Sequence, residues 1–168
     1  GPLECRPYNG RTWAECKKPV RLPATYRRTQ GVQHFLAMYD VHHNFLWGWF
    51  YKRKRGEEFI EFLKRVRGAY ASWVRIYVVM DNFSPHIRQD VKKYAAKSRM
   101  ELVYIATNAS WMNRIEAHFR PLRKFALEGS YPKTHEELEK QIMDYLEWRN
   151  ANPNDPEILE EQKKCRVA

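Results

Sequence analysis

Cysteine is scarce in this chain, and long apolar runs are absent. Three cysteines in 168 residues, an odd number, do not make the disulfide framework of a small secreted domain, and they favour a reducing cytosol. No apolar run is long enough to span a bilayer, and no apolar signal region opens the chain. We therefore expect a cytoplasmic protein of one domain, because a chain of this length buries ~70% of its unfolded surface without disulfides.

Positive charge is in excess, and it is unevenly spread. The net charge is +10; residues 1–133 hold 25 Lys and Arg against 11 Asp and Glu, whereas residues 134–168 hold 5 against 9. The basic part also carries most of the aromatic residues. Cations interleaved with aromatic rings suit a phosphate backbone with exposed bases nearby, although a basic surface over an aromatic core explains the same composition.

The residue pattern predicts an irregular arm, then a hairpin and a helix. Prolines and cations dominate residues 1–30, which argues against regular structure there. Residues 32–41 and 45–51 are rich in apolar and aromatic side chains, and the polar turn between them predicts an antiparallel hairpin whose second strand is buried on both faces. A helix is expected over residues 59–70, because apolar residues recur there at helical spacing.

The middle of the chain predicts a parallel βαβ unit. Residues 74–80 form a short β-branched run that favours a central strand, and residues 101–105 predict a further strand. Ser84 and Pro85 suit a helix N-cap followed by proline at the first helical position. Strand, helix and strand over about thirty residues are the parts of such a unit.

Two more helices are expected after this unit. Ser110 suits the cap of a helix that carries Glu116, and we expect a kink or a junction of two helices near Pro121, which removes a hydrogen bond. Thr134 opens a last helix with a capping box. Residues 152–168 are expected to be either a mobile tail or a segment that docks on a basic surface.

Two acidic residues, Asp81 and Glu116, are the candidates for chemistry, with 34 residues between them. Asp81 follows a buried strand, at the edge of the sheet where α/β proteins place their sites, and Glu116 lies on a later helix. Carboxylates placed in this way can hold divalent metal ions for phosphodiester cleavage. The alternatives are a capping aspartate and a solvent-facing glutamate paired with Arg120. The polar cluster Asp-Asn, followed by Ser-Pro-His, favours the functional interpretation.

Two histidines and several cations lie near these acids in the sequence. His86 and His118 are candidates for orienting the carboxylates, since imidazole can hold a carboxylate in place; packed histidines are the alternative. Cations near Glu116 suit DNA phosphates, and a solvated helix face is the competing explanation. These cations are Arg114, Arg120, Arg123 and Lys124.

The residues around both acids resemble the catalytic core of DDE transposases. The similar stretches are residues 79–82 with His86, and residues 108–116, whose Ser-Trp-Met-Asn-Arg-Ile-Glu run is quite specific. The bacterial insertion-sequence branch of the mariner-like superfamily, the most similar branch, also places 34 residues between its second and third acids. Residues 10–13, 26–28 and 148–150 extend the resemblance over nearly the whole chain.

This resemblance implies an RNase H-like α/β fold, a mixed β-sheet flanked by helices, with Asp81 and Glu116 as catalytic and metal-binding residues. It implies Mg²⁺ or Mn²⁺, two ions when the full acidic triad is present, and cleavage and strand transfer at transposon ends. The implied partners are DNA, both transposon ends and target, and a second copy of the chain, in a nucleoid-associated bacterial or archaeal protein. The implied supporting residues are Asn82, His86, Asn113 and His118, and the implied DNA-binding residues are Arg27, Arg28, Arg114, Arg120, Arg123 and Lys124.

One departure from the family pattern limits the expected activity. The family's first aspartate and its helix-turn-helix DNA-binding region precede the stretch that residues 1–3 resemble, so we expect a single catalytic domain over residues 1–168 without these parts. Asp40 suits the hairpin turn rather than the missing role, and Glu4 is a poor replacement. Because two carboxylates hold two metals poorly, little or no cleavage is expected from this chain alone. The alternatives are an inactive DNA-binding or assembly module of transposase origin and an RNase H-like nuclease for branched or hybrid substrates.

Overall fold

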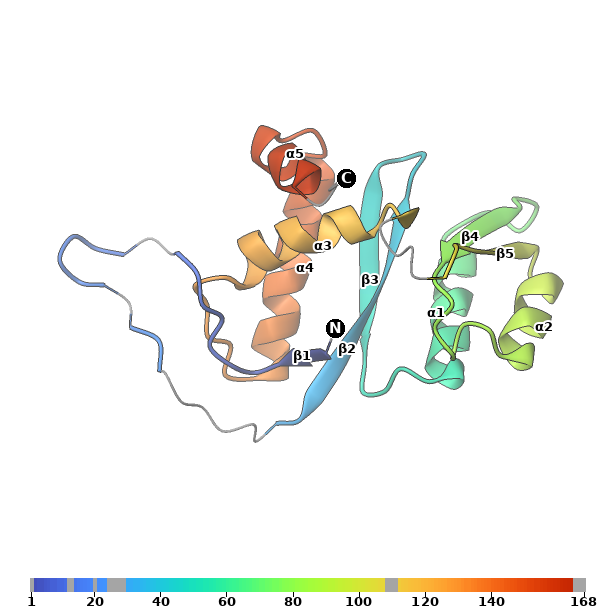
Figure 1. The fold of residues 1–168 in the computed structure, drawn as a ribbon, viewed down its shortest axis with the longest axis horizontal. Helices are drawn as coiled ribbons and strands as arrows, with labels where there is room; N and C mark the ends of the chain where they lie inside the picture. The colour runs from blue at the N-terminus through green and yellow to red at the C-terminus, as the bar shows by residue number, and fades with distance from the viewer. Residues whose placement is uncertain (1, 12–13, 20, 24–29, 108–111, 165–168) are drawn as a thin grey trace. The chain divides into compact units, whose positions relative to one another are not determined.

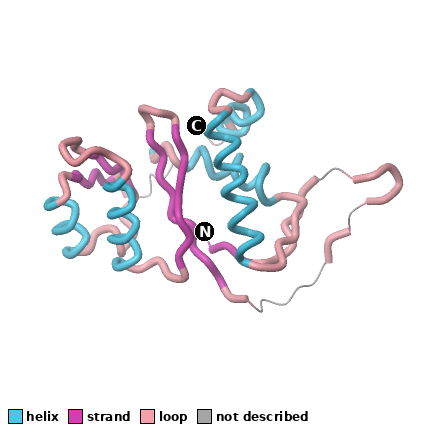
Figure 2. Tube along the Cα trace, turned by 180° about the vertical axis from the view of Figure 1, so that it is seen from behind, coloured by secondary structure: helices cyan, strands magenta, loops and turns pink. Residues whose placement is uncertain are grey.

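Two compact units make up the chain in the computed structural model. Unit 1 comprises residues 1–50 and 117–168, and unit 2 comprises residues 51–116. The structure describes residues 2–11, 14–19, 21–23, 30–107 and 112–164. Figure 1 labels the helices and strands, and Figure 2 shows the same trace from behind. None of the described helices is long and apolar enough to cross a bilayer.

Unit 1 contains a three-stranded sheet in the order β1 (Pro2–Glu4), β2 (Val32–Asp40) and β3 (Phe45–Tyr51). β1 pairs antiparallel with β2. The short connection between β2 and β3 leaves room only for an antiparallel hairpin, as predicted. Asp40 lies in its turn, where Oδ1 accepts from the backbone N–H groups of His42 at 2.9 Å and His43 at 3.1 Å.

The second strand of the hairpin is less buried than expected. Phe45 at its start is exposed, and the interior residues alternate between buried and half-buried positions. Gly48 is needed in this strand because a Cβ atom there would lie 2.5 Å from the carbonyl oxygen of Leu36 and 2.6 Å from the Phe35 ring. The hairpin strands therefore approach each other closely at this point.

The helices of unit 1 are α3 (Glu116–Leu122, with its first residue in unit 2), the π-helix η2 (Arg123–Leu127), α4 (His135–Ala151) and α5 (Pro156–Lys163). Thr134 caps α4 as predicted, its side chain accepting from the N–H of Glu137 at 3.2 Å. α4 is tied to β3 by Asn150, which exchanges hydrogen bonds with the backbone N–H and carbonyl of Leu46 at 2.9 and 2.8 Å. The helices and the hairpin enclose a core of fully buried side chains that includes Leu46, Leu138, Ile142, Leu146 and Ile158.

Pro121 changes the type of helix rather than breaking it. It is buried inside α3, and the chain passes directly from α3 into η2 at Arg123. The N–H of Glu128 donates to the carbonyl of Arg123 at 3.0 Å, five residues back, which is the π-helical pattern. The expected junction of two helices near this proline is therefore present, because the ring supplies no N–H for the α-helical ladder.

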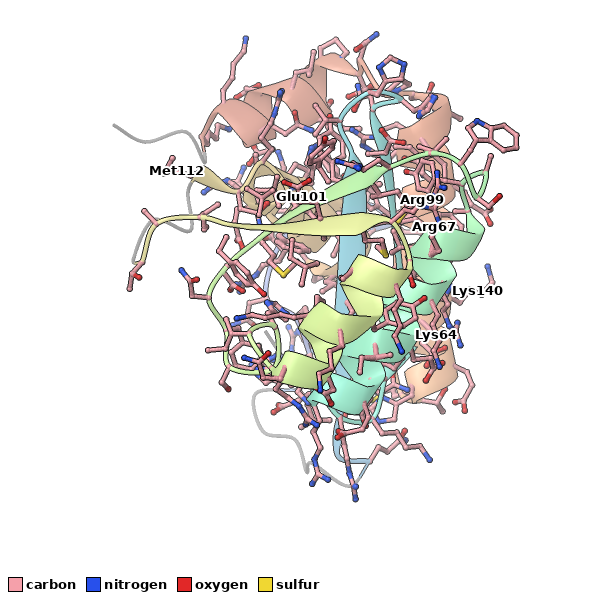
Figure 3. All side chains as sticks on the ribbon, turned by 90° about the vertical axis from the view of Figure 1, so that its right-hand side faces the viewer. Lys64, Arg67, Arg99, Glu101, Met112 and Lys140 are labelled. Carbon is pink, nitrogen blue, oxygen red and sulfur yellow. The ribbon has the colours of Figure 1, made fainter. Side chains whose placement is uncertain are left out.

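Unit 2 is the predicted parallel βαβ arrangement, preceded by a helix. Its elements are α1 (Gly56–Gly68), β4 (Ile76–Met80), α2 (Gln89–Lys97) and β5 (Met100–Tyr104). β4 and β5 pair in parallel, with Val78 opposite Leu102. α2 packs on β5 and on α1, and Figure 3 shows both helices beside the two strands. Phe59, Phe62, Leu63 and Val66 form the buried face of α1.

The expected start of α2 at Ser84 and Pro85 is wrong. Residues 84–87 form a turn, and the helix begins at Gln89 after an extended Arg88. Two hydrogen bonds stabilise the turn: the N–H of His86 donates to the carbonyl of Phe83 at 2.8 Å, and the Tyr104 hydroxyl donates to the carbonyl of His86 at 3.0 Å. The second bond occupies an acceptor that a helix starting at Pro85 would use for its own ladder.

Candidate active site

Asp81 lies where β4 ends and the chain turns out of the sheet. Met80 before it is buried, whereas the Asp81 side chain is 51% exposed. The ends of β4 and β5 are fixed together here, because the Asn82 side chain donates to the carbonyl of Ile105 at 2.8 Å and the N–H of Ile105 donates to the carbonyl of Met80 at 3.0 Å. Asn82 thus holds the loop that presents Asp81.

His86 is brought directly against Asp81 by the turn. Its Nδ1 lies 2.8 Å from Asp81 Oδ1, and the N–H of Phe83 lies 3.3 Å from the same oxygen. An ionised carboxylate only accepts hydrogen bonds, so this contact requires the proton of the imidazole on Nδ1. Among the described residues Asp81 Oδ2 makes no hydrogen bond, so one oxygen of an oriented carboxylate faces outward.

The His86 ring is itself held by two aromatic neighbours. It lies on the Phe59 ring with 4.1 Å between centroids and meets the Phe83 ring at 5.4 Å and 81°. Its side chain is 17% exposed. The imidazole therefore has a fixed position, as a residue that orients a carboxylate requires.

Glu116 is the first residue of α3 and the last residue of unit 2. Its N–H donates to the carbonyl of Asn113 at 3.0 Å, so Asn113 contributes to the turn that starts the helix. Burial raises the pKa of the Glu116 carboxyl, and the negative charge of Asp81 raises this pKa further. The two carboxylates thus lie within electrostatic range of each other. Residues 108–111 lie outside the described residues, and the predicted cap Ser110 is one of them.

The fit to a divalent metal can be judged from these groups. Two carboxylates whose like charges repel each other are hard oxygen donors, which suit Mg²⁺ or Mn²⁺ better than a soft metal. Over the described parts of the chain no group of three or more His, Cys, Asp and Glu side chains is arranged to hold a metal. The residues present fit one hard cation, and a pair of cations needs further oxygens.

His118 occupies the position of a packed histidine. It is 5% exposed, its ring lies 4.0 Å from the Tyr39 ring between centroids, and its Nδ1 is 3.0 Å from the side-chain nitrogen of Gln162. These contacts belong to unit 1, whereas Asp81 and His86 belong to unit 2. The structure therefore pairs only His86, of the two candidate histidines, with an acid in the same unit.

The cations proposed for DNA binding fall into three groups. Arg120 and Lys124 pair with the buried carboxylate of Glu161 on α5, at 2.8 and 2.9 Å. Arg114 and Arg123 are exposed, and neither forms an ion pair with another residue that the structure describes. Arg27 and Arg28 lie in the stretch 24–29, which is outside the described residues.

Tyr104 takes part in the site without any signal in the sequence. Its hydroxyl holds the carbonyl of His86, and burial raises the pKa of that hydroxyl, so it remains a hydrogen-bond donor at neutral pH. An aromatic residue at the end of a predicted strand is expected to pack, so sequence alone gave no reason to place it beside His86.

Comparison with known proteins decides the family. The model of the DDE superfamily endonuclease family matches residues 2–139. This chain belongs to that family. A search of the curated proteins gives no match. The prediction of a DDE-type catalytic domain, made from the residues around Asp81 and Glu116, is therefore confirmed.

Solved structures show the same fold at low sequence identity. The Mos1 strand transfer complex aligns with a TM-score of 0.66 and 14% identity, covering 98% of this chain and 51% of that chain. The Mos1 mariner paired end complex with Mn gives 0.66 and 14%, covering 98% and 52%. A simian T-cell lymphotropic virus intasome in complex with PP2A regulatory subunit B56 gamma gives 0.50 and 13%, covering 84% and 48%. These matches confirm the RNase H-like α/β fold, and the chain spans about half the length of the chains it matches.

Proposed function

We propose that this chain is the catalytic domain of a DDE transposase, which cuts DNA at transposon ends and transfers the strand to target DNA. The observation that carries the proposal is the placement of Asp81 and Glu116: both lie in unit 2, and the charge of one raises the pKa of the other. Two close, partly exposed carboxylates at the carboxyl end of a parallel strand, in a DDE endonuclease chain, are suited to a divalent cation.

Each residue of the site has a role in this proposal. Asp81 Oδ2 and the Glu116 carboxylate hold the cation, His86 fixes Asp81 through Oδ1, and Asn82 fixes the loop. Bound Mg²⁺ or Mn²⁺ would supply Lewis acidity toward the oxygens of the scissile phosphodiester. Because these 168 residues offer two carboxylates for a reaction that uses two ions, we expect little or no cleavage by them alone; robust Mg²⁺-dependent nicking would contradict this.

DNA is the proposed partner, in a complex of two copies of the protein. The similar solved structures include a Mos1 strand transfer complex and a Mos1 paired-end complex. Arg114 and Arg123 are available for phosphates on the described surface, whereas Arg120 and Lys124 reach DNA only by exchanging the carboxylate of Glu161. We also place Arg27 and Arg28 on the DNA, from the resemblance of their stretch to the family.

A second function is favoured by one observation. The described residues present no group of three or more metal-ligating side chains, which suits a DNA-binding or assembly module without catalysis. The two functions differ in whether the carboxylate pair binds a metal. Metal affinity, measured without DNA, therefore separates them.

Calorimetric titration with Mn²⁺ tests the proposal. The wild-type chain should bind Mn²⁺, Asp81→Asn and Glu116→Gln should abolish binding, and His86→Ala should weaken it about 10- to 100-fold because the carboxylate loses its orientation. Glu101→Gln is the matched control, since Glu101 is an exposed carboxylate on β5 whose nearest cation, Arg75, is 3.9 Å away. Absence of Mn²⁺ binding by the wild-type chain favours the non-catalytic module instead.

A further inference from the structure

Four consecutive cations, Lys52–Arg55, connect β3 to α1, and all four are exposed. Other cations of unit 2 are neutralised by neighbours: Arg65 pairs with Glu61 at 2.9 Å, and Arg88 pairs with Glu57 at 2.9 Å. No ion pair joins Lys52, Arg53 or Lys54 to any other described residue. This loop is therefore a concentration of uncompensated positive charge within the unit that carries Asp81.

The loop reaches the candidate active site through a single aromatic ring. Lys54 Nζ lies 4.9 Å from the centroid of the Phe83 ring, a cation–π contact that holds the loop beside the turn after β4. Phe83 is two residues beyond Asp81, its N–H lies 3.3 Å from Asp81 Oδ1, and its ring meets the ring of His86. Lys54, Phe83 and Asp81 thus form one continuous surface within unit 2.

Phe83 remains accessible in spite of these contacts. The residue is 37% exposed, which is more than its packing against His86 alone requires. An exposed aromatic ring beside an ammonium group offers a stacking surface for a base next to a binding site for the phosphate of the same strand. A base inside a duplex cannot reach such a ring without leaving its stack, so the arrangement suits unpaired nucleotides.

We propose that Lys52, Lys54 and Phe83 form a subsite for a DNA strand end with unpaired nucleotides, next to Asp81. The two lysines bind backbone phosphates, and the Phe83 ring stacks on an unpaired base, which places the neighbouring phosphodiester toward the acid. The subsite rests on the proposed DNA cleavage function and names the strand conformation that this function uses. A purely solvated turn, and a surface for an acidic peptide, are the outcomes that the test below excludes or establishes.

The phosphate contacts are tested by the salt dependence of DNA affinity, measured without divalent metal on a duplex that ends in a short single-stranded overhang. Lys54→Ala should weaken binding and lower the slope of log affinity against log salt by about 0.7, the value for one phosphate contact on a single strand. Lys64→Ala is the matched control, because Lys64 is an exposed lysine on α1 of the same unit (Figure 3). Equal effects of the two substitutions would show that the loop is merely solvated.

The stacking contact is tested with 2-aminopurine in the overhang, whose fluorescence is quenched when it stacks on an aromatic ring. Quenching should occur with the wild-type chain and with Phe83→Trp, and it should disappear with Phe83→Leu, which keeps an apolar side chain but loses the ring. Phe83→Leu should also weaken overhang binding about tenfold while affinity for a blunt duplex changes little. Thermal unfolding of each variant verifies that it folds.

Failure of the subsite and failure of the proposed function are distinguishable. The fluorescence assay contains no metal, and the Mn²⁺ titration contains no DNA. Overhang DNA that binds the wild-type chain without quenching, or with quenching that Phe83→Leu leaves intact, overturns the subsite and leaves the metal site standing. No binding of overhang DNA, or binding of an acidic peptide that competes with it equally, also overturns the subsite.

Discussion

At the scale of single residues, the site depends on the electrostatic coupling of Asp81 and Glu116. Burial and the charge of Asp81 both raise the pKa of Glu116 above its usual value of 4.5. For an acid whose pKa is higher in the folded state, the free energy of unfolding falls as pH rises from the ordinary pKa through the raised one. The metal-free site is therefore a source of instability at neutral pH, which a bound cation would relieve.

Removing one charge of the pair should relax the other residue. In Asp81→Asn without metal, we expect the pKa of Glu116 to move down toward its usual value, and the protein to be slightly more stable at neutral pH than wild type. Side-chain carboxyl signals followed by NMR during a pH titration measure the first effect, and thermal unfolding measures the second. Glu101→Gln should change neither. An unaltered Glu116 titration in Asp81→Asn would mean that the two carboxylates do not interact.

The sequence predicts these two acids but not the residues that support them. The 34-residue spacing and the strand before Asp81 are local patterns, and both survive in the structure. Contacts that join segments far apart in the chain leave no such pattern. Lys54 with Phe83, and Tyr104 with His86, are brought together only by the packing of α1, β4 and β5, so their proximity could not be derived.

At the scale of elements, α5 is the least expected part of the chain. It forms because Asp155 caps it, with Oδ1 2.9 Å from the N–H of Glu157, and because Pro156 occupies its first position. Ile158 and Glu161 are buried, so the predicted alternative of a docked segment holds for residues 156–163. The local cap could be predicted, whereas the docking depends on cations about forty positions earlier in the sequence.

Glu161 gives α5 a pH-dependent attachment. Hydrogen bonds from Lys164, Arg120 and Lys124 lower the pKa of Glu161 to about 2. For a depressed acid, the stabilising contribution is complete above the ordinary pKa of 4.5 and is lost as pH falls toward 2. We therefore expect Glu161→Gln to unfold at a lower temperature than wild type at pH 7, and the difference to shrink below pH 4.5. Thermal unfolding across this range measures it.

The matched control for this prediction is Glu160→Gln. Glu160 is the preceding carboxylate of α5, and its side chain is 67% exposed although it pairs with Lys164 at 2.9 Å. An exposed ion pair contributes little to stability, so Glu160→Gln should leave the unfolding temperature nearly unchanged. Equal effects of the two substitutions would contradict a buried role for Glu161.

The element boundaries show where local signals fail. The hairpin, α1, the parallel β4–β5 pair and the Thr134 cap agree with the sequence, because strong apolar periodicity or a specific cap defines each of them. The Ser84–Pro85 signal suits a helix start equally well as a turn. Hydrogen bonds to Asp81 and from Tyr104 decide for the turn, and these come from the strands on either side.

At the scale of the whole molecule, the family and the fold class are the parts that sequence determines best. A DDE endonuclease family model matches residues 2–139, and the RNase H-like fold is shared with transposase chains at 14% identity. A fold can persist at such identity because it depends on the apolar pattern of its elements rather than on particular residues. Substrate and assembly depend on particular surface residues, which is why they enter as proposals.

The most direct test of the shared metal site uses Mn²⁺ as a paramagnetic probe in NMR spectra of the metal-free chain. Substoichiometric Mn²⁺ should broaden the backbone signals of Asp81, Asn82 and His86 together with that of Glu116, Mg²⁺ should not broaden them, and Asp81→Asn should abolish the effect. Broadening confined to only one of the two acids, or centred elsewhere on the chain and retained in Asp81→Asn, would contradict a cation shared by Asp81 and Glu116.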